Sequence, residues 1–316
     1  MHVIDYLKIV TKIFEKMERD LPTRLKSGIA ALRGIPNGLT AEETNAAYVK
    51  ENEILFAEVS DILFPRFEKS SYPKQGQSLW RMTIPCFDDF DPSQIKYFRE
   101  PPVAVCKRGR CNIPLHPVFY CSMNPKFSII EVLQGSLEMQ KKAFLTEWEV
   151  SESRNWSTLG MFLDDIPNSN PFFDAKEIYL PAFVTLLKET MSDQQQVEYR
   201  KILNEEFMKA GDHKFASLVS VDFLYGPDSN GDVVLYPSSQ GNKYDCNLAF
   251  NYKHLENNTI TFKRGFILEN LQMIMRGNTP TFQFQCQSSV SNKSEPLNWQ
   301  PTSDEEKRLL YTILGE

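Results

Sequence analysis

The sequence predicts an α+β fold, with a mixed β-sheet core, helices packed against it and an added N-terminal helical layer. Residues 1–75 carry apolar residues at helical spacing. From residue 78 onward, short apolar runs separated by prolines and other turn residues are typical of strands. Strands and helices do not alternate regularly, which favours an α+β fold over a doubly wound parallel sheet.

Two helices are expected in the N-terminal layer. The first helix is expected to end at Pro22. Its apolar face consists of residues spaced alternately four and three positions apart, namely Val3, Leu7, Val10, Phe14, Met17 and Leu21. Thr40 and Glu43 form a capping box that opens the second helix, which runs toward Phe64. We interpret the layer as a cover for the sheet, and a docking surface for a partner is the alternative.

The sheet core is expected within residues 76–262. SLWRMTIPCF, PPVAVC and HPVFYCS are predicted strands, residues 125–142 a helix and residues 144–150 another strand. A helix over Pro181–Met191 would hold its proline in the first turn. Ser192 and Gln195 predict a capping box for the next helix, which Gly211 ends.

Further short strands are predicted at VVLYP, NLAF, TITFK and TFQFQC. Residues 263–316 are expected to add C-terminal strands and a helix over Asp304–Leu314, packed on the core.

The composition excludes several classes of protein. The chain of 316 residues is 41% hydrophobic and carries a formal net charge of −6, which argues against broad, direct nucleic-acid binding. No run approaches the roughly 18 apolar residues of a membrane span, and no apolar signal segment opens the chain. We therefore expect a cytoplasmic protein without a membrane partner, whose six cysteines are reduced thiols.

Standard catalytic and metal motifs are absent. The sequence contains no Walker loop, G-x-G-x-x-G, H-E-x-x-H or G-x-S-x-G. Cys106, Cys111, His116 and Cys121 recur every five residues, which suits neither a zinc knuckle nor one face of a strand. We expect free thiols there and no metal site.

Residues 109–132, GRCNIPLHPVFYCSMNPKFSIIEV, carry the pattern that indicates chemistry. Arg110, Tyr120 and Glu131 lie ten and then eleven residues apart. Glu131 stands inside an apolar run, where a buried carboxylate is costly unless it is paired, so we expect it to be functional. A glutamate on the solvent side of a helix is the alternative. Arg108 is interpreted as a solvated charge.

This segment resembles the central motif of the RES domain family, which is named for its arginine, glutamate and serine. The central parts are Gly109-Arg110-Cys111-Asn112, Val118-Phe119-Tyr120 and Ile129-Ile130-Glu131. Leu79-Trp80-Arg81 is similar to the family's opening strand, and Phe215-Ala216-Ser217-Leu218 to its closing helix. Leu235-Tyr236-Pro237-Ser238 is similar to the turn that follows, and Asn247-Leu248-Ala249-Phe250 to the last strand. Cys111 replaces the family's aromatic residue, and the insertion between Glu131 and Ser238 is longer than in compact members.

The resemblance implies an ADP-ribosyltransferase-like fold over about residues 78–262, and NAD as substrate with no bound cofactor. Arg81 and Arg110 would bind the pyrophosphate through charge-assisted hydrogen bonds. Tyr120 would contact nicotinamide or ribose, and Ser238 would contact phosphate or ribose. Glu131 would stabilise the oxocarbenium-like state formed when the nicotinamide–ribose bond breaks. Glu131, Arg110 and Tyr120 are therefore the candidate catalytic residues.

Three functions follow from this resemblance. The expected one is an NAD glycohydrolase or phosphorylase that acts as the toxin of a toxin–antitoxin pair, with NAD, phosphate and an antitoxin protein as partners. A protein ADP-ribosyltransferase is the first alternative. A non-catalytic NAD-binding or scaffold relative is the second.

Overall fold

The sheet dominates the architecture of the computed structural model, which describes residues 20–36, 41–54, 64–85, 89–133, 136–161, 166–170, 172–209, 211–226, 231–238, 246–276, 279–291 and 295–314. Ten strands in these ranges form one sheet in the order β1-β5-β6-β7-β3-β2-β4-β8-β9-β10. Neighbouring strands are antiparallel except β5 and β6, which are parallel. The predicted α+β class is therefore confirmed.

The bounds of the elements are as follows. The strands are β1 (Arg66–Ser70), β2 (Ser78–Thr83), β3 (Phe119–Ser122), β4 (Gln140–Val150), β5 (Trp156–Gly160), β6 (Val233–Pro237), β7 (Cys246–Phe250), β8 (Ile260–Arg276), β9 (Thr279–Val290) and β10 (Gln300–Pro301). The α-helices are α2 (Leu21–Arg33), α3 (Ala41–Ile54), α4 (Pro125–Leu133), α5 (Phe173–Lys188), α6 (Asp193–Met208), α7 (Lys214–Tyr225), α8 (Lys253–Glu256) and α9 (Asp304–Leu314). Two 3₁₀ helices are η2 (Ile95–Phe98) and η3 (Val103–Val105).

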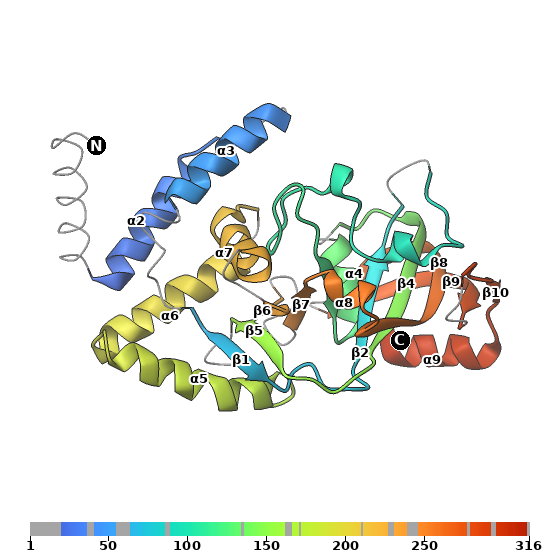
Figure 1. Ribbon diagram of the computed structural model, residues 1–316. Helices are drawn as coiled ribbons and strands as arrows, with labels where there is room; N and C mark the ends of the chain where they lie inside the picture. Colours follow the sequence, from blue (N-terminus) through green and yellow to red (C-terminus); the bar gives the residue numbers. More distant parts are fainter. Residues whose placement is uncertain are drawn as a thin grey trace.

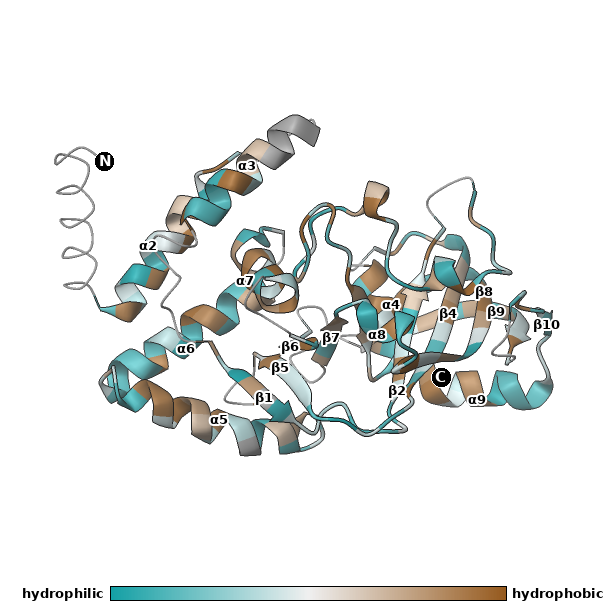
Figure 2. Cartoon of the chain, viewed as in Figure 1, coloured by the Kyte–Doolittle hydropathy of each residue, from teal (hydrophilic) through white to brown (hydrophobic). Residues whose placement is uncertain are grey.

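Two groups of helices cover different ends of the sheet (Figure 1). Leu25, Ile29 and Leu32 of α2 belong to one apolar core with α5, α6, α7 and the strands β5, β6 and β7. Helix α7 is apolar along most of its length (Figure 2), and nearly all of it is buried in this core. Helices α4 and α9 form a separate core with β2, β4, β8 and β9. The N-terminal helix α2 therefore packs on the sheet body. It begins at Leu21 with Pro22 in its first turn, where the sequence had predicted the end of a helix.

Both cores lie on the same face of the sheet. Trp80 pairs with Ser122, and two residues earlier on β3 Tyr120 pairs with Ala249. Paired residues, and residues two apart on a strand, point to the same face. Trp80 belongs to the α4–α9 core and Ala249 to the α2–α7 core. The two helical groups thus flank the middle of one face, where β2, β3 and β7 run.

Several predicted elements agree with the structure. The Ser192–Gln195 capping box is present at the start of α6. Helix α9 spans Asp304–Leu314 as predicted. Strands β6, β7 and β9 contain three of the predicted apolar runs, and β8 begins at the second residue of the fourth. The predicted first helix before residue 20 and the Thr40 capping box lie outside the described residues.

Other predictions were wrong for identifiable reasons. The helix predicted over 125–142 ends at Leu133, because residues 140–142 join the ladder between β4 and β8. PPVAVC forms the 3₁₀ helix η3, since its two prolines cannot donate to a strand ladder. Pro181 lies inside α5, which begins earlier, where Asn170 Oδ1 accepts a hydrogen bond from the Phe172 N–H at 2.8 Å.

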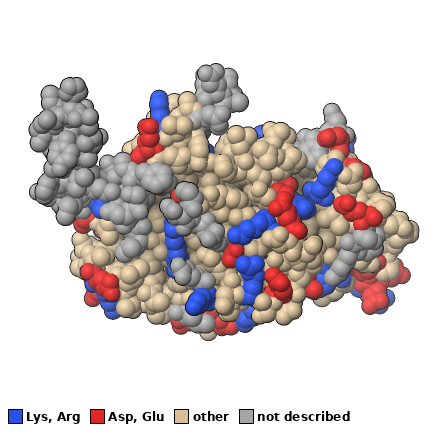
Figure 3. All heavy atoms as spheres, viewed as in Figure 1, with Lys and Arg blue, Asp and Glu red and all other residues tan. Residues whose placement is uncertain are grey.

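The sheet extends beyond the range predicted for it. Strand β1 precedes residue 76, and β8 runs through residue 262 to pair with β9. Within the described residues, no helix has the length and apolarity needed to cross a bilayer. On the face drawn in Figure 3, acidic and basic side chains are interspersed.

Candidate active site

A cavity of about 610 Å³ lies beside β2 and β3, where the sheet is most weakly joined. Strands β2 and β3 share a single residue pair there, Trp80 with Ser122. The structure brings four of the five predicted site residues, Arg81, Arg110, Tyr120 and Glu131, to this cavity. The full lining is Trp80, Arg81, Met82, Arg108, Gly109, Arg110, Tyr120, Cys121, Ser128, Glu131, Val132, Gly211, His213, Tyr236 and Asn247.

The charges of this lining favour an anionic ligand. The lining contains three arginines and one carboxylate, Glu131, so the arginines remain in excess even though Arg108 is paired with Glu51. Guanidinium groups concentrated in a concave site raise the local potential and bind phosphate oxygens with charge-assisted hydrogen bonds. The cavity also has the volume typical of small-molecule sites, which is about 300–1,000 Å³.

Glu131 is held at the cavity by two side chains from distant segments. It is half-buried on α4, and one of its oxygens, Oε1, accepts hydrogen bonds from Ser238 Oγ at 2.5 Å and Asn247 Nδ2 at 2.9 Å. Both donors are buried, with exposed fractions of 0% and 4%. The carboxylate therefore has a fixed orientation, unlike the solvent-facing glutamate that was the alternative.

Ser238 does not have the position that the sequence predicted for it. It follows β6 and is fully buried behind Glu131, so its hydroxyl supports the carboxylate and does not line the cavity. The pairing of Tyr236 with Asn247 across β6 and β7 brings the two donors to the same carboxylate oxygen.

The Tyr120 hydroxyl is used within the protein, which leaves only one of the two contacts predicted for this residue. Its hydroxyl accepts a hydrogen bond from the Cys111 N–H at 2.6 Å and donates one to Asn112 Oδ1 at 2.9 Å. Burial raises the pKa of this hydroxyl well above its ordinary value. The hydroxyl is thus occupied in holding the turn that carries Arg110, and only the ring remains for a ligand.

This turn is closely packed. The Gly109 N–H donates to the Asn112 carbonyl at 3.0 Å. A Cβ at Gly109 would lie 2.5 Å from Asn112 Oδ1 and 2.9 Å from the Tyr120 hydroxyl, closer than such contacts allow. A larger residue before Arg110 would therefore have to displace the Asn112 and Tyr120 side chains, which hydrogen-bond to each other.

The two predicted arginines enter the cavity from different elements. Arg110 is 8% exposed, and its guanidinium lies 5.3 Å from the centre of the Tyr236 ring. Arg81 on β2 donates to the Tyr120 carbonyl at 2.9 Å. Burial lowers the pKa of Arg81 because the charged form loses hydration. An anionic ligand would replace part of that lost hydration.

Arg108 is not a solvated charge, so this interpretation was wrong. Its guanidinium contacts Glu51 Oε2 of α3 at 2.5 Å and Ser217 Oγ of α7 at 3.0 Å. The Glu51 side chain is 1% exposed and also lies 3.9 Å from Lys214 Nζ. The N-terminal helical layer therefore holds one wall of the cavity through a buried ion pair.

Sequence reasoning missed three residues of the site: Asn247, His213 and Glu51. Asn247 was noted only as part of a strand, although an amide in an apolar run is itself a signal. His213 precedes α7 with no motif around it. Glu51 lies on a helix rich in charge, where nothing distinguishes it from its exposed neighbours.

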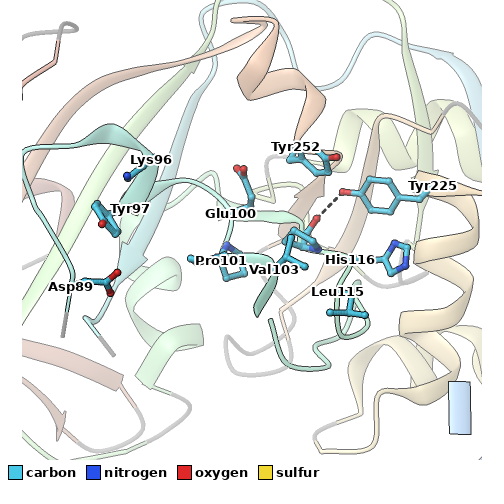
Figure 4. A pocket seen from close by; sticks show the side chains of 12 residues that line it. Asp89, Lys96, Tyr97, Glu100, Pro101, Val103, Leu115, His116, Tyr225 and Tyr252 are labelled. Atoms are coloured by element: carbon cyan, nitrogen blue, oxygen red, sulfur yellow. Dashed lines mark hydrogen bonds between the residues drawn. The ribbon is translucent and has the colours of Figure 1, made fainter. Parts of the chain in front are cut away.

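A second cavity, of about 690 Å³, contains none of the predicted site residues (Figure 4). Tyr97, Tyr225 and Tyr252 surround Glu100, whose carboxylate is paired with Arg99 at 3.3 Å. Lys96 and Asp89 add one charge of each sign. This balance gives the second cavity no preference for an anion or a cation.

The cysteines of the five-residue repeat are buried free thiols. Burial raises the pKa of Cys106 and, to about 12, that of Cys111. Among the described residues, no group of three His, Cys, Asp or Glu side chains could hold a metal ion.

Comparison with known proteins adds no relative. No protein-family model matches the chain, and no curated protein is significantly similar to it. The resemblance to the RES domain family therefore rests on the motif segments alone, and functional assignment depends on the geometry of the cavity.

Proposed function

We propose that this chain binds NAD in the cavity and breaks its nicotinamide–ribose bond, transferring the ADP-ribosyl group to water or phosphate. The observation that carries the proposal is the position of Glu131, a carboxylate fixed by Ser238 and Asn247 in a cavity whose lining also contains three arginines. Arg81 and Arg110 suit the pyrophosphate, and Glu131 suits the positive charge that develops on ribose.

In this reaction the C1′–N1 bond of NAD breaks, and its electron pair leaves with nicotinamide, which becomes neutral. The ribose ring gains oxocarbenium character, as in glycoside hydrolysis. Glu131 stabilises that charge from its fixed position. An oxygen of water or phosphate then forms the new bond to C1′, and water releases a proton to solvent.

Product analysis tests the proposal. Purified protein is incubated with NAD, with and without phosphate, and the products are identified by mass. Nicotinamide with ADP-ribose indicates hydrolysis, and nicotinamide with ADP-ribose 1″-phosphate indicates phosphorolysis. A mass increase of ADP-ribose on added protein would instead support the transferase alternative. Intact NAD after prolonged incubation with folded protein would refute the proposal.

We further propose that the enzyme acts as a cytoplasmic toxin controlled by an antitoxin protein. An uncontrolled enzyme of this kind would deplete the NAD of its own cell. Expression of the chain alone should therefore arrest growth, and Glu131→Ala should relieve the arrest. Harmless high-level expression of an active enzyme would contradict the toxin proposal while leaving the reaction intact.

A further inference from the structure

His213 occupies a position in the cavity that the proposed chemistry has not used. It immediately precedes α7 and lines the cavity together with Arg110 and Glu131. Its Nδ1 atom is buried and has no hydrogen-bond partner among the described residues. The ring as a whole is half-buried. Nε2 is therefore the ring nitrogen left for a ligand.

The surroundings of His213 keep the imidazole uncharged. Burial lowers its pKa, and the positive charge of Arg110 lowers it further, against smaller opposing effects of Asp212 and Glu131. Protonation would also place an N–H on Nδ1, where no described acceptor lies. A buried donor without an acceptor is unfavourable, so the single proton of the neutral ring belongs on Nε2.

We propose that His213 contacts the substrate directly and donates its Nε2 proton to the carboxamide oxygen of nicotinamide. This proposal rests on the proposed function and adds a specificity residue to it. The arginines of the cavity suit the anionic pyrophosphate, whereas the nicotinamide ring of NAD is itself a cation. A neutral donor binds the carboxamide without adding a positive charge beside that ring.

The test compares the full-length wild type with three variants. His213→Leu removes the donor, and His213→Gln restores a neutral donor near the position of Nε2. His116→Leu is the matched control, because His116 is also a half-buried histidine whose pKa burial lowers, but it lines the second cavity. Circular dichroism and urea unfolding confirm that each variant is folded.

Two readouts separate a substrate contact from a structural role. His213→Leu should raise the KM for NAD by about tenfold, the loss expected for one hydrogen bond, with a smaller change in kcat. It should weaken inhibition by nicotinamide by about tenfold and leave inhibition by ADP-ribose unchanged. His213→Gln should recover most of both effects, and His116→Leu should resemble the wild type.

The pH dependence of NAD affinity provides an independent check. The pKa of His213 lies below the ordinary value of about 6.5. As the pH falls through that lowered pKa, the imidazole becomes protonated and positively charged beside the nicotinamide cation. NAD affinity should therefore fall for the wild type and stay level over the same range for His213→Gln.

Three results would overturn the inference. The first is that His213→Leu binds nicotinamide as tightly as the wild type does. The second is that His213→Leu loses affinity for ADP-ribose and not for nicotinamide. The third is that NAD affinity depends on pH in the same way in the wild type and in His213→Gln. If the wild type cleaves NAD and Glu131→Gln does not, such results refute only the role of His213. A folded wild type that does not bind NAD would refute the proposed function as well.

Discussion

The Ser238 hydroxyl donates a 2.5 Å hydrogen bond to the Glu131 carboxylate, although the two residues are 107 positions apart in the chain. Asn247 donates to the same carboxylate oxygen from the neighbouring strand. A carboxylate held by two buried donors needs little reorganisation when charge develops beside it, which is the condition for electrostatic catalysis.

Glu131→Gln should lower the rate of NAD cleavage by about 10²–10³ while NAD still binds, because the variant keeps the shape and removes the charge. Single-turnover rates and calorimetric affinities measure the two effects separately. Glu138→Gln, at an exposed position, is the control and should be unaffected. Wild-type turnover in Glu131→Gln would show that the carboxylate is structural.

Ser238→Ala should lower turnover by about tenfold with little change in NAD affinity, since it removes one hydrogen bond to a charged group. The double variant with Glu131→Gln tests the connection, because residues that act through one another are not additive. Ser238→Ala should cause little further loss in that background. A full additional loss would mean that Ser238 acts on the substrate independently of Glu131.

Arg110→Ala should weaken NAD binding as well as turnover, because it removes contacts to the pyrophosphate that exist before the reaction. Arg110→Lys should recover only part of the affinity, since an ammonium group cannot form a two-pronged contact with phosphate oxygens. In calorimetry, affinity should decrease from the wild type to Arg110→Lys to Arg110→Ala, for NAD and for ADP-ribose alike. An unchanged affinity in Arg110→Ala would place the pyrophosphate elsewhere.

Tyr120→Phe should raise the KM for NAD several-fold, because the turn carrying Arg110 loses its hydrogen bonds to the Tyr120 hydroxyl. The free energy of unfolding should fall by about 1–3 kcal/mol, as the Cys111 N–H and Asn112 Oδ1 lose a buried partner. Steady-state kinetics and urea unfolding measure both. Tyr311→Phe on α9, away from the cavity, is the control. A lower kcat with unchanged KM and stability would instead assign the hydroxyl to the reaction.

Asp232 should stabilise the folded protein at neutral pH, and this stabilisation should be lost in acid. Burial alone would raise its pKa, but hydrogen bonds from His254 and the Ser157 N–H, with the charge of Lys253, lower it to about 2. The folded pKa lies below the unfolded value of about 4, so this stabilisation is complete above pH 4 and is lost as the pH falls toward 2.

Urea unfolding across this pH range measures the effect. The wild type should lose roughly 2 kcal/mol more than Asp232→Asn, which starts from a lower stability, because carboxylates such as Glu147, whose pKa is also lowered, titrate in both proteins. Asp304→Asn, at a 92% exposed side chain, is the control. Equal acid sensitivity of the wild type and Asp232→Asn would contradict the prediction.

Local patterns allowed much of the site to be predicted. Arg110, Tyr120 and Glu131 lie within one short segment, and short strands and capping boxes follow from neighbouring residues. Contacts between distant segments could not be predicted. The burial of Ser238 depends on the register of β6 with β7, and the ion pair of Arg108 depends on how α3 approaches the cavity. Neither is determined by residues adjacent in the sequence.

The support of Glu131 also determines when the site can exist during synthesis. Its donors follow 107 and 116 residues later, so a ribosome has already made the arginines, the tyrosine and the glutamate long before Ser238 and Asn247 emerge. A nascent or prematurely terminated chain that stops before residue 238 has the chemical groups without their scaffold. The activity proposed for this site should thus be withheld from chains that end before residue 247.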